Sequence, residues 1–368
     1  MKIVCLIDNL GSGGAQRQLV NLSILWKKNG HDISFICYNR NYFYESYLLK
    51  ENIDIIWIDS NNLFQRLIKV RAEIKKNAPD IVVSFMAIPG FIACFSSIGH
   101  HKWKLITNEL SADKVFLKTY RSKVFKFFER FSNWTVCNSD NAKKMWNQYY
   151  PQYSNRISTI YNPVIIPEKE IIRAKNHKYS KKRTIVIAAS YRYLKNPIGV
   201  VNAIKNLKAD TRKNLIIKWY GHAEVTLGDT KAYDETVELI KQYNLENILI
   251  LHNETENIYK EMAEADAIAL FSKLEGLPNV ICEGMMLGKP ILMSKISDYS
   301  VLVDDTNGLL CEVEKYENIT DVLEKFLSFS DEELDNMGKN SRKKAIQLFD
   351  PQIINKKWEE LFLKIKSL

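Results

Sequence analysis

The sequence has little of what marks a disulfide-bonded, metal-binding or membrane-spanning protein. Its six cysteines are scattered singly with no C-x-x-C pair, which argues against a zinc site and a disulfide framework. The N-terminus is a short apolar run that ends at Asp8, unlike a signal peptide with its long apolar centre. The one stretch that approaches membrane-spanning length, 81–99, is divided by Pro89-Gly90 and predicts a buried strand and helix. We therefore expect a protein of a reducing, cytoplasmic compartment.

A dinucleotide fingerprint is also missing. The glycine loop of residues 9–16 follows the first predicted strand and opens a helix, where a phosphate-cradling loop belongs. However, Gln16 stands where G-x-G-x-x-G needs its third glycine, and no ribose-binding acid follows the strand predicted at 32–37. The sequence thus argues against NAD binding. Gly13 and Gly14 either allow the backbone to approach a ligand or form a plain tight turn.

Short β-rich runs alternate with helical patterns along the chain, which is typical of βαβ units and parallel sheets. The first set of strands is expected at 2–7, 32–37, 53–57, 81–85, 104–107, 134–137 and 156–160, and the second at 184–188, 214–220, 247–251, 267–271 and 290–294. A chain of 368 residues suits about two domains. We predict Rossmann-like domains at 1–166 and 184–345, a linker at 167–183 and an amphipathic C-terminal helix at 346–368.

The net charge of +9 is confined to the first half of the chain. Residues 1–165 hold 22 Lys and Arg against 12 Asp and Glu, which gives +10, whereas residues 166–368 hold 30 against 31, which gives −1. This asymmetry indicates an anionic partner for the N-terminal half, such as a membrane surface or a lipid phosphate. No nucleic-acid-binding motif accompanies the charge, so we do not expect nucleic acid as a partner.

Cations and aromatic residues are interleaved in the segment 114–131. On a helix, Phe116, Tyr120, Val124, Phe127, Phe128 and Phe131 can share one face, which Lys118, Arg121, Lys123, Lys126 and Arg130 largely avoid. Such a helix could lie on an anionic membrane or hold a lipid diphosphate, with Lys118 and Arg121 as contacts. An ordinary amphipathic helix with a core face would show the same pattern.

Two carboxylates, Glu275 and Glu283, stand eight positions apart across a predicted helix start. Pro278 suits the first helical position, and Gly288 gives a stop. Glu275 should then precede the helix and Glu283 lie about two turns into it. The helix start comprises Gly276, Leu277, Pro278 and Asn279. Its free backbone N–H groups, which Pro278 lacks, favour the binding of an anion between the two carboxylates. A nucleotide sugar, with hydroxyls at both ends and phosphate between, is such a ligand.

Lys195 and Arg192 follow the first predicted strand of the second domain. Cations at the carboxyl end of a parallel strand face the crevice where α/β domains bind ligands. They could neutralise a diphosphate leaving group, although a solvated loop would carry similar charges.

The motifs together resemble those of a known enzyme family. In chain order they are Gly13-Gly14-Ala15, Lys195-Asn196-Pro197, Glu275-Gly276-Leu277-Pro278 with Glu283, Gly288-Lys289-Pro290 and Asn307-Gly308-Leu309. This set resembles the retaining GT-B glycosyltransferases of the E-x7-E class (family 4, group 1), which includes enzymes of capsule, O-antigen, lipopolysaccharide and lipid-linked oligosaccharide synthesis. The resemblance implies an α/β chain of two Rossmann-like parallel-sheet domains that face a central cleft, with the last helix crossing back to the first domain.

The resemblance also implies residue roles. Glu275 would bind donor-sugar hydroxyls, Glu283 the ribose, and Lys195 the departing diphosphate. The family's glycine and arginine are replaced by Ala189 and Ser190, so we expect Arg192 to supply the guanidinium.

A second departure lies after the fifth strand, where many members carry a histidine. Leu110 stands there, and none of the six histidines is an obvious substitute. The neighbouring Glu109 is a candidate for acceptor contact or base assistance, or simply a helix-capping acid.

The expected reaction transfers a hexose or N-acetylhexosamine from a nucleotide sugar, UDP-linked rather than GDP-linked, to a glycan acceptor carried on a lipid. No D-x-D triplet occurs, so we expect neither a metal nor another cofactor, with cations and helix amides neutralising the leaving group. The basic half suits peripheral attachment to the inner membrane face. The alternatives are a non-hydrolysing sugar-nucleotide epimerase of the same fold and a catalytically silent protein that binds membranes or glycans.

Overall fold

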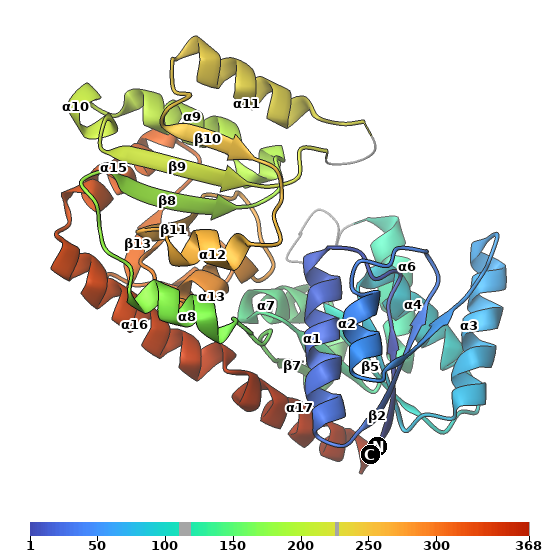
Figure 1. Cartoon of the computed structure of the whole chain (residues 1–368). Helices are drawn as coiled ribbons and strands as arrows, with labels where there is room; N and C mark the ends of the chain where they lie inside the picture. The colour runs from blue at the N-terminus through green and yellow to red at the C-terminus, as the bar shows by residue number, and fades with distance from the viewer. Residues whose placement is uncertain (110–118, 225–227, 368) are drawn as a thin grey trace. The chain divides into compact units, whose positions relative to one another are not determined.

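The computed structural model describes residues 1–109, 119–224 and 228–367 (Figure 1). The chain divides into two compact units. Unit 1 comprises Met1–Pro163 and Phe349–Leu368, and unit 2 comprises Val164–Leu348. Unit 1 therefore ends three residues before the predicted boundary at residue 166, and it includes most of the segment predicted as the C-terminal helix.

Unit 1 is built on a parallel seven-stranded sheet of order β3-β2-β1-β4-β5-β6-β7. The strands are β1 (Lys2–Leu6), β2 (Asp32–Cys37), β3 (Asp54–Trp57), β4 (Ile81–Phe85), β5 (Lys104–Glu109), β6 (Trp134–Cys137) and β7 (Ile157–Thr159). Each predicted strand is present, with ends shifted by no more than two residues. The central strands β1 and β4 are almost continuously apolar and buried, because helices cover both faces of a parallel sheet.

The helices of unit 1 follow the strands in alternation. They are α1 (Gly14–Lys28), α2 (Glu45–Lys50), α3 (Leu63–Asn77), α4 (Ala87–Ser96), α6 (Tyr120–Phe128), α7 (Asp140–Tyr149) and α17 (Pro351–Lys366), with 3-10 turns η1 (Glu129–Phe131) and η2 (Pro151–Arg156). Side-chain caps fix several starts: the Asn62 side chain accepts from the Gln65 amide, and the Ser139 side chain from that of Ala142.

The C-terminal helix α17 packs on unit 1 through the apolar stripe visible in its sequence. The Trp358 and Phe362 rings lie 5.1 and 5.2 Å from the Trp26 ring of α1, in edge-to-face arrangements. His31 adds a polar contact to Glu359, at 2.9 Å. The last helix is therefore part of the core of unit 1.

The segment 81–99 is a strand followed by a helix, as predicted, although the break falls earlier. β4 ends at Phe85 and α4 begins at Ala87, so Pro89 lies in the first turn of the helix, where its missing amide costs nothing. Met86 joins the two elements with a φ of 74°. Across the described part of the chain, no helix combines the length and apolar character needed to cross a bilayer.

Unit 2 holds a parallel six-stranded sheet of order β10-β9-β8-β11-β12-β13. The strands are β8 (Arg183–Ala188), β9 (Leu215–Tyr220), β10 (Leu249–His252), β11 (Ala267–Leu270), β12 (Ile291–Ser294) and β13 (Gly308–Cys311). The helices are α8 (Glu168–Lys175), α9 (Pro197–Asn206), α10 (Ala209–Arg212), α11 (Lys231–Gln242), α12 (Ile258–Ala263), α13 (Asn279–Met286), α14 (Tyr299–Leu302), α15 (Tyr316–Ser328) and α16 (Asp331–Phe349), with the 3-10 turn η3 (Tyr193–Lys195). The first five strands were predicted; β13 was not.

Part of the predicted linker 167–183 is helical. Its residues 168–175 form α8, with acids in the first turn and Arg173 in the last, which complements the helix dipole. Arg173 donates to Glu264 at 2.7 Å, beside the end of α12, and His177 contacts Asp266 at 2.7 Å. These contacts attach the segment to unit 2.

Candidate active site

The strand order of unit 2 reverses between β8 and β11. β9 and β10 extend the sheet on the β8 side, and β12 and β13 extend it on the β11 side. In open parallel sheets the carboxyl ends at such a switch point form the crevice in which ligands bind. The loops after β8 and β11 therefore define the expected ligand site of this unit, and they carry Lys195 and Glu275.

The structure brings these two predicted residues together although 80 positions separate them. Lys195 Nζ donates to Glu275 Oε1 in an ion pair whose side chains are 21% and 13% exposed. Ser272 Oγ donates to the same oxygen at 2.7 Å. A backbone bond of 2.8 Å from Lys273 N to Leu194 O joins the two loops. The pair is thus fixed by the main chain as well as by its own charges.

Both donors reach Oε1 of Glu275, and no described side chain donates to its Oε2. A lysine ammonium also has three donors, of which this contact uses one. The pair therefore retains acceptor capacity on the carboxylate and donor capacity on the ammonium. This combination can bind a sugar hydroxyl and a phosphate oxygen side by side.

The helix α13 begins one residue later than predicted. Pro278 has a φ of −76° and a ψ of 87°, outside the helical region, so it is the N-cap and Asn279 is the first helical residue. Glu283 is therefore the fifth residue of the helix, just over one turn in rather than two, and it is buried. Gly288 does follow the end of the helix, with a φ of 73° that suits glycine.

Close packing holds α13 against the sheet. A Cβ added to Gly284 would lie 2.7 Å from Cγ1 of Ile268 in β11, so only glycine allows this approach. In the loop before the helix, the buried Leu277 anchors the chain, and Ser297 Oγ donates to the Gly276 carbonyl. The amides at the start of α13 are consequently held at the carboxyl edge, near the strand that leads to Glu275.

Arg192 lies in the same turn as Lys195, because Lys195 N donates to the Arg192 carbonyl at 2.8 Å. Its side chain is exposed. A second cation at the phosphates must lie close to Lys195, and Arg192 meets this requirement. Its service as the family's guanidinium stays a prediction.

Gly13 and Gly14 belong to unit 1, at the start of α1, after the loop that follows β1. Gly13 is the N-cap, and a Cβ there would meet Gln16 Oε1 at 2.3 Å. Gln16 in turn donates to Asp8 and Asn9 at 3.4 and 3.3 Å. The residue that replaces the third glycine thus connects the start of α1 to the beginning of the loop that follows β1. The donor role of the two glycines stays a prediction.

Glu109, a predicted acceptor residue, is buried at the end of β5 with two donors. Lys126 Nζ and Trp146 Nε1 donate to its Oε2 at 2.8 and 3.0 Å. Burial lowers the pKa of Lys126, but the charges of Glu109 and Glu129 outweigh it and raise that pKa overall. The structure therefore gives Glu109 an ion-pair role, and its contact with an acceptor stays a prediction. Lys118 and the side chain of Arg121 lie outside the described residues.

The described part of the predicted basic helix, α6 with η1, differs from the expected arrangement. Lys126 is buried, whereas Tyr120 and Phe127 are 83% and 52% exposed. Lys126 lies in the interior because Glu109 neutralises it, and Phe127 turns outward beneath Arg130. Phe128 and Phe131 do pack against the core of unit 1.

The two serines that position the Glu275 loop, Ser272 and Ser297, were not predicted. Ser272 is the second residue after the buried strand β11, where side chains reach the carboxyl edge, so the strand pattern contained the signal. Ser297 has a φ of 54° that the sequence does not reveal. Within the described ranges no group of three or more His, Cys, Asp or Glu side chains is placed to hold a metal ion.

Two family models match the chain. Residues 168–344 match the model described as glycosyl transferases group 1, and residues 12–166 match glycosyltransferase family 4. The chain is 23% identical to the GalNAc-alpha-(1->4)-GalNAc-alpha-(1->3)-diNAcBac-PP-undecaprenol alpha-1,4-N-acetyl-D-galactosaminyltransferase of Campylobacter jejuni, over 100% of this chain and 99% of that protein. It is 22% identical to the amylovoran biosynthesis glycosyltransferase AmsD of Erwinia amylovora, over 98% and 99% of the two chains.

Among solved structures, Anabaena Alr3699/HepE in complex with UDP-glucose superposes with a TM-score of 0.84. The alignment covers 100% of both chains at 18% identity. This likeness confirms the predicted fold class, a GT-B chain with two Rossmann-like parallel-sheet domains.

Proposed function

Because the chain belongs to the group 1 glycosyltransferases, we propose that it transfers a hexose or N-acetylhexosamine from a UDP-linked donor to a lipid-linked glycan. The product would be a bacterial surface polysaccharide, formed with retention of anomeric configuration. The observation that carries the proposal is the Lys195–Glu275 pair at the switch point of unit 2. The Campylobacter relative, whose name includes an undecaprenol diphosphate acceptor, supports the lipid-linked acceptor. The UDP-glucose complex of Alr3699/HepE supports the choice of UDP.

In this proposal the donor diphosphate lies between Lys195 and the start of α13. The two unused donors of the lysine and the helix amides would stabilise charge as the glycosidic bond breaks. Glu275 Oε2 would accept from a hydroxyl of the transferred sugar, and Glu283 would hold the ribose. Arg192, from the same turn as Lys195, would add a second positive charge at the phosphates.

The departing phosphate oxygen would help to take the proton from the acceptor hydroxyl on the same face of the sugar. This route does not require a base at the family's histidine position, where Leu110 stands in the sequence. We also propose that no divalent ion is required. Transfer by enzyme pretreated with a chelator should equal that of untreated enzyme, and full dependence on added magnesium or manganese would contradict the proposal.

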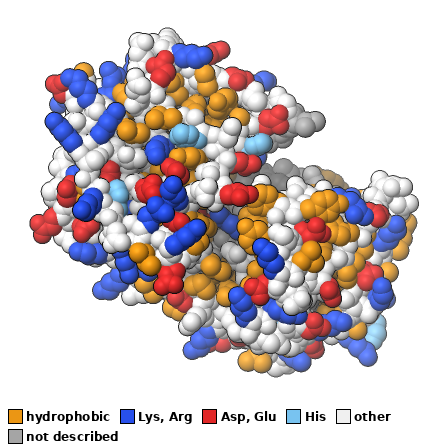
Figure 2. Space-filling view, viewed as in Figure 1, with side chains coloured by type: hydrophobic (Ala, Val, Ile, Leu, Met, Phe, Trp, Pro, Cys, Tyr) orange, Lys and Arg blue, Asp and Glu red, His pale blue; other side chains and the backbone are white. Residues whose placement is uncertain are grey.

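Attachment to the inner face of the membrane would involve unit 1. Residues 1–165 carry a net charge of +10. Helices α2 and α3 also expose large apolar side chains, among them Leu49, Phe64 and Ile68, and Figure 2 shows apolar side chains gathered beside cations on one face of unit 1. An apolar surface beside cations suits the interface of an anionic bilayer.

The direct test is a product assay in which a panel of UDP- and GDP-sugars is crossed with lipid-linked and soluble acceptors. Glu275→Gln tests the site, and the exposed Glu246→Gln in the same unit is the matched control. Transfer to a lipid-linked acceptor that fails only in Glu275→Gln supports the proposal. Conversion of the donor to an epimer without acceptor would identify an epimerase. Donor binding with no turnover in any combination would identify a silent binding protein.

A further inference from the structure

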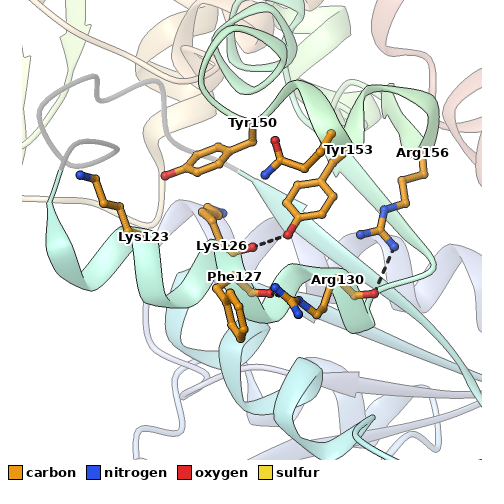
Figure 3. Close-up of a pocket in the computed structure, with 8 residues that line it drawn as sticks. Lys123, Lys126, Phe127, Arg130, Tyr150, Tyr153 and Arg156 are labelled. Atoms are coloured by element: carbon orange, nitrogen blue, oxygen red, sulfur yellow. Dashed lines mark hydrogen bonds between the residues drawn. The ribbon is translucent and has the colours of Figure 1, made fainter.

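A cavity of about 580 Å³ opens in unit 1 between the α6–η1 segment and the segment 150–156 (Figure 3). Its lining includes four cations from these two segments: Lys123, Lys126, Arg130 and Arg156. Its walls are aromatic, formed by Phe127, Tyr150 and Tyr153. None of the described residues that line it is acidic. The cavity therefore combines concentrated positive charge with apolar surface.

Three of the four cations form no ion pair with any described carboxylate. Lys126 is balanced by Glu109, 2.8 Å away, and both side chains are less than a tenth exposed. Its ammonium also lies 4.1 Å from the centre of the Trp146 ring. By contrast, Lys123, Arg130 and Arg156 have no carboxylate within 4.0 Å among the residues that the structure describes. Lys123 and Arg130 are exposed and Arg156 is half-buried, so solvent reaches all three charges and an incoming anion can reach them as well.

The two guanidinium groups are held in place without being neutralised. Arg156 donates to the Glu129 carbonyl at 3.1 Å and stacks 4.7 Å from the Tyr153 ring. Arg130 lies 3.5 Å from the centre of the Phe127 ring and donates from Nε to the Phe127 carbonyl at 3.0 Å. Tyr153 is itself fixed by its hydroxyl, which donates to the Lys126 carbonyl at 2.8 Å (Figure 3). Backbone carbonyls and aromatic rings orient the two guanidinium groups, but they carry no formal negative charge, so both arginines keep their net positive charge.

We propose that this cavity binds the phosphate group of a lipid phosphate ester, with Lys123, Arg130 and Arg156 as its ligands. Fixed guanidinium groups match the oxygens of phosphate, and lysine adds a point charge. The aromatic walls suit the apolar part of the same molecule. Two sources share this chemistry, the diphosphate of a lipid-linked acceptor and the headgroup of an anionic phospholipid. The first source rests on the proposed function, whereas the second does not.

The test compares the full-length wild type with Lys123→Gln/Arg130→Gln and with a control, Lys75→Gln/Lys76→Gln. The control also removes two positive charges, but from exposed positions of α3. Arg156 is left unchanged because its guanidinium bonds the carbonyls of Glu129, Arg130 and Ser132 and so joins the two segments that form the cavity. Inorganic pyrophosphate is titrated by calorimetry at fixed salt and saturating UDP, so that the expected donor site is occupied. The cavity variant should bind pyrophosphate about a hundredfold more weakly, roughly tenfold for each charge-assisted contact, with the control and UDP affinity unchanged. Equal weakening in both variants, or in neither, would overturn the proposal.

Vesicle flotation then separates the sources. Phosphatidylcholine vesicles are used alone, with phosphatidylglycerol, or with undecaprenyl diphosphate. Binding that the cavity variant loses only with undecaprenyl diphosphate supports the acceptor as ligand, and loss with phosphatidylglycerol supports a headgroup. Loss with neither lipid overturns the proposal. If no donor and acceptor pair reacts, the proposed function fails, while pyrophosphate binding by the cavity is judged independently.

Discussion

Lys195→Gln removes the cation that the structure places against Glu275 and retains a side chain of similar reach. In a partly buried site, one positioned donor to a developing negative charge contributes about 3–4 kcal/mol, or roughly 100- to 1000-fold in rate. Lys195 is 21% exposed, so we expect kcat/KM for transfer to fall by roughly 100-fold, the lower end of that range. UDP binding should weaken by roughly tenfold, which corresponds to one charge-assisted bond to the diphosphate.

The same substitution leaves Glu275 with Ser272 as its remaining donor. Exposed ion pairs contribute up to about 1 kcal/mol, and breaking a buried pair costs about 3–5 kcal/mol. The exposures of 21% and 13% place this pair between those limits, so the free energy of unfolding should fall by about 1–3 kcal/mol. Adding Glu275→Gln should recover part of that loss, because the unpaired carboxylate is then gone.

Initial transfer rates, UDP affinity and urea unfolding should be measured for Lys195→Gln and for Lys208→Gln, an exposed control in the same unit. The control should match the wild type in all three. A folded Lys195→Gln protein whose kcat/KM stays within about threefold of the wild type would refute the assignment of Lys195 to the leaving group.

The remaining predictions concern packing, a buried charge and the second cation. Gly284→Ala should lower the free energy of unfolding by about 1–3 kcal/mol in urea, because its Cβ would clash with Ile268 at 2.7 Å, whereas Gly90→Ala in α4, with 3.8 Å of space, should not destabilise. Burial lowers the pKa of Lys289 to about 8, against the partial opposition of nearby acids. Folding therefore disfavours its charged form: the wild type should gain stability between pH 8 and about 10, and Lys289→Met should lose that gain and be more stable at pH 7 by roughly 3 kcal/mol in urea titrations. Arg192→Gln should lower kcat/KM by roughly tenfold in the transfer assay; unchanged turnover would show that it does not replace the family's arginine.

The proximity of Lys195 and Glu275 was predictable because a general rule links sequence to space. Parallel strands bring their carboxyl ends to one edge, so residues that follow different strands meet there. Lys195 follows β8 and Glu275 follows β11, and their contact requires no knowledge of the segments between. The predicted start of α13 was wrong by one residue. Proline is found at either the N-cap or the first helical position, and the ψ angle that distinguishes the two cannot be derived from the sequence.

Other features depended on contacts between distant residues or on very short signals. The burial of Lys126 follows from Glu109, 17 positions earlier, and a helical pattern read alone assigns every lysine to the solvent. The strand β13 (Gly308–Cys311) begins with glycine and directly follows Asn307, and both residue types are typical of turns rather than of strands. The helix α8 lies in a polar stretch, and its one buried side chain is that of Glu170, which accepts from Arg173 at 2.8 Å, so hydrophobic periodicity gives no sign of the helix.

The division of the chain allows the donor and lipid ends of the reaction to be perturbed separately. Lys195, Glu275 and Glu283 belong to unit 2, whereas the cationic cavity of Lys123 and Arg130 belongs to unit 1. If the cavity holds the diphosphate of the acceptor, Lys123→Gln/Arg130→Gln should raise KM for a lipid-linked acceptor and leave KM for a soluble one unchanged. Lys195→Gln should lower turnover with both acceptors. If the cavity variant instead slowed transfer to both acceptors equally, its charges would act on the donor or on folding, and the separation of roles between the units would be wrong.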